Sequence, residues 1–241
     1  MDELEIQGLR QRIEEVKGDI ARIAAEAGRA PEDITLIGVS KVFPWEYAAE
    51  AFKAGLMDLG ENKVQDLTAK IDELQSIGLE PRWHMIGTLQ KNKVKYLIGK
   101  THLIHSVNTV ELAEEISKRS VCNNVITDIL LQVNVSGEES KHGFAPEETK
   151  DAIEKIGAMD GIRLKGMMTM APIEQYEGQA RSVFADTYKL WEDMRSYVPS
   201  VKEWNVLSMG MSQDYASAIK EGATHIRIGT AIFGDRSKFL V

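Results

Sequence analysis

The sequence predicts an α/β fold, a single (β/α)8 TIM barrel with an additional helix at its N-terminus. Three observations predict it: the chain has 241 residues, short apolar runs of strand length alternate with amphipathic stretches, and there are eight such runs. A barrel of this kind takes about 250 residues, and strands that alternate with helices form a parallel sheet through right-handed crossovers. The eight runs are Thr35–Ser40, Leu56–Gly60, Arg82–Gly87, Leu103–Val107, Asp128–Asn134, Leu164–Met170, Val206–Gly210 and His225–Gly229.

The segment before the first run is predicted to be a leading helix, over residues 1–30. Its apolar residues recur at alternating steps of three and four, with charged residues between them. The barrel is expected over residues 34–234 and a loose tail over residues 235–241. Because no linker composition interrupts the alternation of strands and helices, residues 1–241 are expected to form one domain.

Helical stretches separate the apolar runs. An open, doubly wound sheet would usually carry a glycine-rich fingerprint after its first strand. The first run here ends in Val39-Ser40-Lys41 without that fingerprint, so the closed barrel is favoured over the open sheet. The predicted helical stretches include Trp45–Ala54, Thr109–Lys118, Pro146–Ile156, Gln175–Met194 and Ser212–Lys220.

Composition excludes several classes of protein. The formal net charge of -8 argues against a general nucleic-acid binder, which needs a basic surface. No apolar run approaches the ~20 residues of a membrane span, and the acidic start of the chain does not resemble a targeting segment. The single cysteine, Cys122, excludes an internal disulfide and is interpreted as a structural thiol. A cytoplasmic protein with no membrane partner is expected.

Lys41 is the most informative candidate site residue. It directly follows the first predicted strand, and the active sites of such barrels lie at the carboxyl ends of the strands. Burial lowers the pKa of a lysine, and a neutral amine forms Schiff bases with aldehydes. A lysine whose ammonium reaches solvent or pairs with a carboxylate is the simpler interpretation of this position taken alone.

A phosphate site is predicted beside it. The last strand ends in Gly229-Thr230, where the backbone can approach an anion, a hydroxyl is available and a helix N-terminus follows. Ser212, after the seventh strand, is placed to bind an anion or to cap the next helix. Loops after strands seven and eight form the common phosphate site of these barrels, so the three residues together favour the phosphate.

Three further polar residues belong to the predicted rim. Arg227 lies two residues before Gly229, on the same face of the strand, and either pairs with a carboxylate or faces a ligand. Asn62 and His84 follow or end the second and third strands. For His84, a hydrogen-bonded residue without a binding role is an equally open interpretation.

An aldehyde-reactive lysine facing a phosphate site suggests pyridoxal 5′-phosphate (PLP). At these residues the chain closely resembles the pyridoxal phosphate homeostasis proteins (the YggS/PROSC family), from about Ile34 to Gly234. The loop Lys141–Phe144 also resembles a family motif and is assigned no role. The segments that carry the resemblance are Gly38–Lys41, Gly60–Gln65, Trp83–Lys93, Leu207–Ser212 and Ile226–Thr230.

The resemblance implies a fold type III PLP barrel, similar to the N-terminal domain of alanine racemase. It implies that Lys41 forms the internal aldimine with PLP and that Arg227 faces the pyridine nitrogen. A permanent cation there keeps the nitrogen unprotonated and makes PLP a weaker electron sink. The other implied binding residues are Ser212, Gly229 and Thr230 at the phosphate and Asn62 and His84 beside the ring.

Three functions remain open from the sequence. The first is intracellular PLP homeostasis, in which the protein holds PLP and supplies or buffers it, with apo PLP-dependent enzymes as partners, no catalytic residue, no metal and a monomeric state. The second is an amino-acid racemase of weak activity, since the second domain that supplies a racemase's catalytic tyrosine is not expected here. The third is a class I aldolase-like barrel in which Lys41 attacks a sugar phosphate without a cofactor.

Overall fold

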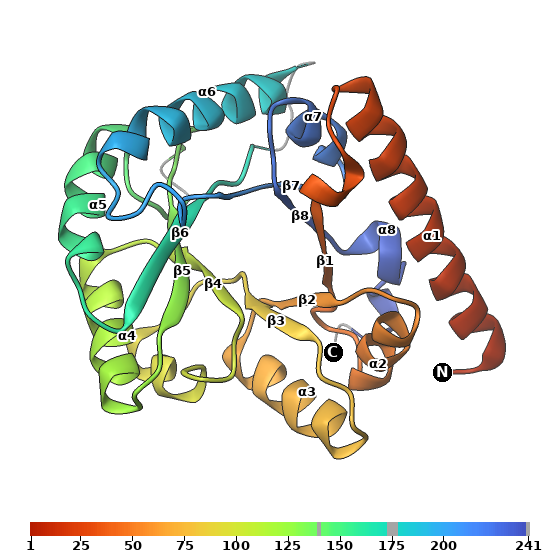
Figure 1. Ribbon diagram of the computed structural model, residues 1–241. Coiled ribbons are helices and arrows are strands. Elements are labelled where there is room, and N and C mark those ends of the chain that lie inside the picture. The colour runs from red at the N-terminus through yellow and green to blue at the C-terminus, as the bar shows by residue number, and fades with distance from the viewer. Residues whose placement is uncertain (139–140, 173–177, 240–241) are drawn as a thin grey trace.

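Eight parallel strands close into a barrel around the centre of the molecule (Figure 1). The computed structural model describes residues 1–138, 141–172 and 178–239. Each strand pairs with the next, and the first closes on the last with Thr35 opposite His225 and Ile37 opposite Arg227. The strands are β1 (Thr35–Val39), β2 (Asp58–Glu61), β3 (Arg82–Met85), β4 (Leu103–Val107), β5 (Thr127–Gln132), β6 (Ile162–Met168), β7 (Val206–Met211) and β8 (His225–Ile228).

Helices cover the outside of the barrel. Their apolar faces pack on the outward side chains of the strands, so both faces of the sheet are buried, as parallel sheets require. After β3 a 3-10 helix, Lys91–Tyr96, stands in place of an α-helix. The α-helices are α1 (Glu3–Glu26), α2 (Trp45–Lys53), α3 (Val64–Ser76), α4 (Val110–Cys122), α5 (Thr149–Gly157), α6 (Gln179–Asp193), α7 (Tyr215–Lys220) and α8 (Thr230–Phe233).

The leading helix α1 lies along the barrel against α2, α7 and α8 (Figure 1). Asp2 and Glu5 form a capping box at its N-terminus, which satisfies two backbone amides that a helix start leaves free. Its apolar stripe, which includes Leu9, Ile13 and Ile20, is buried. Among the helices of the described residues none is long and apolar enough to cross a membrane.

The fold confirms the predicted barrel, and every predicted strand overlaps an observed one. Of the predicted stretch Gln175–Met194, residues 175–177 lie outside the described residues. The sequence did not single out α3. Cys122, interpreted as structural, is exposed at the last position of α4.

The end of the chain differs from the expected loose tail. Residues Ser237–Phe239 form a 3-10 turn, and the ring of Phe239 lies 5.3 Å from the ring of Phe43 and 5.5 Å from that of Tyr47. Such aromatic contacts add to the free energy of burial. This part of the tail therefore packs against Phe43, in the segment that follows Lys41, and against Tyr47 in α2.

Candidate functional site

Lys41 lies at the carboxyl end of β1 and is half-buried. Its surroundings lower the pKa of its ammonium, mainly because burial disfavours the charged form and also because Arg236 repels it. Glu61 acts in the opposite direction and raises that pKa. Arg236 was not predicted as a site residue, because its influence depends on the packing of the chain end. The electrostatics favour a lysine that loses its proton more readily than an exposed one.

A buried group of three polar side chains lies directly behind Lys41, and we call Ser40, Glu61 and Lys70 the ion-pair cluster. Lys70 Nζ forms an ion pair with Glu61 Oε1 and donates to the carbonyl oxygen of Ser40 at 2.8 Å. Ser40 Oγ donates to Glu61 Oε1 at 2.7 Å. Because Ser40 precedes Lys41, the cluster fixes the backbone next to Lys41, and it joins the end of β1 to β2 and α3.

The loops after β7 and β8 meet at Ser212 and Gly229. The amide nitrogen of Gly229 donates to Ser212 Oγ at 3.2 Å, which joins two predicted phosphate residues that are 17 positions apart. Ser212 and Gly229 are half-buried, and Thr230 is exposed at the first position of α8. Ser212 Oγ accepts this bond and keeps its own O–H, which is a donor suited to the oxygens of a phosphate group.

Asn62 is half-buried at the end of β2, and Gly87 holds its backbone in place. A Cβ atom at Gly87 would lie only 2.2 Å from the carbonyl oxygen of Asn62 and 2.6 Å from its Cα. Only glycine allows this close approach of the two loops. The ends of β2 and β3 are therefore packed backbone to backbone, which sets the position of Asn62 at the rim.

Arg227 is buried at the third position of β8. Its Nη1 donates to Ser208 Oγ at 2.6 Å, and its Nη2 donates to the carbonyl oxygen of Thr169 at 2.9 Å. Burial lowers the pKa of Arg227 to about 10, and Asp214 partly offsets this. The group remains a cation at neutral pH, held by two neutral oxygens.

His84 was predicted to line the ring of PLP, but both of its ring nitrogens are bound within the barrel. Nε2 lies 3.0 Å from Asp58 Oδ1, and Nδ1 lies 2.9 Å from Nε2 of His105. His105 Nδ1 in turn lies 2.9 Å from Ser208 Oγ. This arrangement leaves neither nitrogen of His84 for a ligand and connects it to Arg227 through two other residues.

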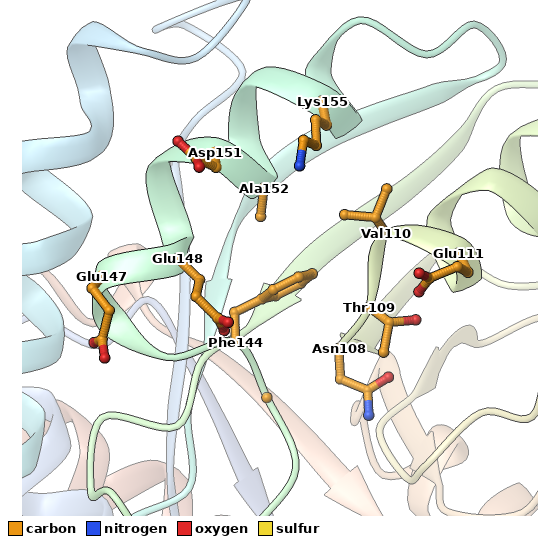
Figure 2. A pocket seen from close by; sticks show the side chains of 11 residues that line it. Asn108, Thr109, Val110, Glu111, Phe144, Glu147, Glu148, Asp151, Ala152 and Lys155 are labelled. Atoms are coloured by element: carbon orange, nitrogen blue, oxygen red, sulfur yellow. The ribbon is translucent and has the colours of Figure 1, made fainter.

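A surface groove of about 430 Å³ lies between the start of α4 and α5, with Phe144 between its walls (Figure 2). Carboxylates dominate its polar lining, since Lys155 is accompanied by four acidic residues, and they would repel a phosphate. None of the predicted site residues lines it. The acidic residues are Glu111, Glu147, Glu148 and Asp151.

The structure thus places the predicted residues at one end of the barrel, but two of them differ from the others in orientation or exposure. His84 faces the barrel interior, and Thr230 is exposed. The sequence missed His105 and Lys70, which contact site residues or their neighbours. A polar residue inside an apolar run, as His105 is in Leu103–Val107, was the available signal.

Comparison with known proteins gives consistent matches over most of the chain. Residues 21–237 match the family described as alanine racemase, N-terminal domain. The chain is 41% identical over 230 residues to the pyridoxal phosphate homeostasis protein of Aquifex aeolicus, covering 94% of this chain and 97% of the relative. It is 37% identical over 226 residues to that of Pseudomonas aeruginosa, covering 94% and 95%.

Solved structures agree with these matches. A protein of Bifidobacterium adolescentis superposes with a TM-score of 0.91 at 33% identity, covering 96% of this chain and 97% of the other. The PLP-bound structure of PipY from Synechococcus elongatus superposes with a TM-score of 0.77 at 31% identity, covering 89% and 100%. An alanine racemase of Clostridium difficile, at 19% identity and a TM-score of 0.71, shares the fold over 94% of this chain and 56% of its own length. By its barrel, by its motifs and by these relatives, the chain belongs to the family of the pyridoxal phosphate homeostasis proteins.

Proposed function

We propose that this protein binds PLP covalently through Lys41 and holds it for supply to other proteins. The observation that carries the proposal is that a half-buried lysine of lowered pKa shares one end of the barrel with the joined loops of Ser212 and Gly229. The PLP-bound structure of PipY and the relatives named for PLP homeostasis support it. The donors present fit PLP, which offers one aldehyde, one phosphate and one ring nitrogen.

Each predicted residue has a distinct task in this proposal. Lys41 would hold PLP covalently, through its Nζ and the aldehyde group of PLP. Ser212, Gly229 and Thr230 would bind the phosphate, and Asn62 would lie beside the ring. When bound, PLP supplies an aldehyde that can be transferred to an amine of a recipient. His84 would act on the site indirectly, through its contacts with Asp58 and His105.

Arg227 would face the pyridine nitrogen. Because its guanidinium only donates hydrogen bonds and stays charged, the ring nitrogen opposite it would remain an unprotonated acceptor. An unprotonated ring withdraws electrons from bound amines less strongly. An arginine at this position is compatible with a protein that holds PLP without a reaction and with a racemase that has additional catalytic groups.

The covalent link is tested by the absorption spectrum of the purified protein with PLP. We expect a visible band that disappears on borohydride reduction, with the reduced adduct located at Lys41 by peptide mass spectrometry. Lys41→Ala should lose the band, and Lys118→Ala, an exposed lysine on α4, should keep it. A wild-type protein that formed no such adduct would contradict PLP binding and favour the aldolase-like alternative.

The phosphate contacts are tested with Ser212→Ala. Loss of a hydrogen bond to a charged group should weaken PLP binding by about 1.5–3 kcal/mol. The measurement is PLP affinity by fluorescence titration, with pyridoxal, which lacks the phosphate, as the matched ligand. Pyridoxal affinity should be unchanged. Equal losses for both ligands would mean that Ser212 acts only through the loop geometry.

The proposal also includes that the protein is a monomer and that it supplies PLP to apo PLP-dependent enzymes. Protein loaded with PLP and freed of excess ligand should activate such an enzyme faster than Lys41→Ala treated in the same way. Sedimentation should give one chain per particle. Steady amino-acid racemisation that Lys41→Ala abolishes would instead assign an enzyme.

A further inference from the structure

A chain of hydrogen bonds crosses the interior of the barrel and ends on Arg227. From Asp58 it runs to His84 (3.0 Å), to His105 (2.9 Å), to Ser208 (2.9 Å) and to Arg227 (2.6 Å). We call Asp58, His84, His105 and Ser208 the histidine relay. Its four members are almost fully buried, at 0–5% exposure, and they come from β2, β3, β4 and β7.

The chemistry of the Asp58 end fixes the direction of every bond. Burial raises the pKa of Asp58, but its hydrogen bonds with Arg82 and His84 outweigh burial and lower that pKa, so Asp58 is a carboxylate and only accepts. Burial lowers the pKa of both His84 and His105, so each ring is neutral with one N–H. His84 therefore carries its proton on Nε2 and accepts at Nδ1.

The same logic continues to the other end. His105 must donate from Nε2 to His84 and accept at Nδ1 from the hydroxyl of Ser208. Ser208 then has only lone pairs left for Arg227, which is a donor and nothing else. Asp58 at one end of the hydrogen-bond series and Arg227 at the other thus require the same donor-to-acceptor direction, and every donor faces an acceptor.

This direction has an electrostatic consequence for Arg227. Hydrogen bonds in a chain polarise one another, so the carboxylate of Asp58 makes Ser208 Oγ a stronger acceptor for the buried cation. Through the relay, Asp58 adds to the stabilisation that Asp214 gives Arg227 through space, and Thr169 contributes a backbone carbonyl. A carboxylate in direct contact with Arg227 would instead bring negative charge toward the ring nitrogen.

We propose that Asp58, His84, His105 and Ser208 are positioning residues that orient Arg227 toward the pyridine nitrogen of PLP. The proposal rests on the proposed function, because it assumes that Arg227 faces PLP. Within the described residues Arg227 uses two N–H groups, and the relay fixes the plane in which the others lie. His102 and His225 lie beside His84, with ring centroids at 5.3 and 6.4 Å.

The first test needs no PLP. The chain has 5 histidines, so a long-range nitrogen–proton NMR spectrum of protein labelled in histidine is simple, and single His102→Gln and His142→Gln variants identify the two exposed ones. We expect His84 and His105 as neutral Nε2–H tautomers at pH 7. An Nδ1–H tautomer or a charged ring at either position would overturn the relay.

The second test compares two buried serines. Ser208→Ala removes the link between Arg227 and His105, whereas Ser106→Ala, in β4, removes a buried hydroxyl that has no partner among the described residues. With Ser208→Ala we expect PLP to bind about tenfold more weakly and the visible band to shift. Ser106→Ala should change neither property, and Ser208→Thr, which keeps the hydroxyl, should restore both.

The outcomes separate this proposal from the proposed function. If wild-type protein binds PLP and Ser208→Ala matches Ser106→Ala in affinity and band position, the positioning role is wrong and PLP binding stands. If wild-type protein binds no PLP, the proposed function and the positioning role both fail, and the NMR result still reports on the hydrogen-bond direction. Equal band shifts in both serine variants would also overturn the positioning role, because they would reflect packing.

Discussion

The ion-pair cluster and the histidine relay are two buried polar groups that serve the same end of the barrel in different ways. The cluster lies outside the strands against α3, contains a full ion pair and contacts the backbone beside Lys41. The relay lies inside the strands, consists mainly of neutral donors and acceptors, and contacts the side chain of Arg227. A reactive amine needs a fixed backbone and a free side chain, whereas a buried guanidinium needs its side chain fixed.

The largest effect of a single substitution should come from breaking the ion pair. Lys70→Met leaves the carboxylate of Glu61, which is fully buried, without its cation, and we expect a loss of about 3–5 kcal/mol of unfolding free energy. Urea denaturation measures it. Lys53→Ala, which removes an exposed pair with Glu50, is the matched control and should cost less than about 1 kcal/mol.

A double variant tests whether the ion pair does more than neutralise Glu61. Replacing both partners, Glu61→Leu with Lys70→Met, should recover most of the stability, since a buried ion pair and an apolar pair of similar volume are often equivalent. A double variant as unstable as Lys70→Met alone would show that the pair specifies the local structure and does more than neutralise Glu61.

The next effect is a loss of stability at acid pH, which arises from the buried histidines. The pKa values of His84, His105 and His225 are all lowered by burial, that of His225 to about 3, so these rings bind protons at lower pH in the folded protein than in the unfolded chain. In the unfolded chain they bind protons below about pH 6.5. Stability should therefore fall as pH falls, by up to about 1.4 kcal/mol per pH unit for each ring.

The pH effect is checked by urea denaturation between pH 7 and pH 5. His225→Gln should reduce the slope without interrupting the relay, because His225 is bonded to Thr224 and lies outside it. Asp58 acts in a lower window: its folded pKa is lowered, so its contribution persists above about pH 4 and is lost in stronger acid. A flat stability profile from pH 7 to pH 5 would contradict the buried neutral histidines.

The smallest effect should come from Ser40→Ala. The change removes a hydroxyl bonded to Glu61 and Lys70 but leaves their ion pair and the bond from Lys70 to the carbonyl of Ser40. We expect a loss of about 1.5 kcal/mol, measured by the same denaturation. A loss as large as that of Lys70→Met would mean that the hydroxyl, not the ion pair, holds the cluster together.

The barrel could be predicted because its signals are local. Each strand is a short apolar run followed by a helical stretch, so the alternation is visible without knowledge of distant contacts. Lys41, Ser212 and Gly229 could be placed at one end because the carboxyl ends of parallel strands meet at the same rim. The packing of the tail could not be predicted in this way. Its aromatic residue Phe239 contacts residues nearly 200 positions away, so no local pattern indicates the contact.

The histidine relay could not be predicted, because its members lie in different strands and its register depends on the closure of the barrel. His84 shows this limit, since the family resemblance implied a place beside the PLP ring, and only the structure shows that its ring nitrogens contact Asp58 and His105. Side chains that meet in a barrel interior come from different strands at the same height along the barrel axis. The pairing register between strands sets these heights, and no local sequence pattern indicates that register.

The sequence by itself therefore determined the strand order, the end of the barrel that carries the site and the chemical types found there. Only the tertiary structure decided which carboxylate supports Lys41 and which supports Arg227. The physical reason is that buried polar groups must find hydrogen-bond partners wherever the packed interior offers them. In this protein those partners are Lys70 for Glu61, outside the strands, and Ser208 for Arg227, inside them.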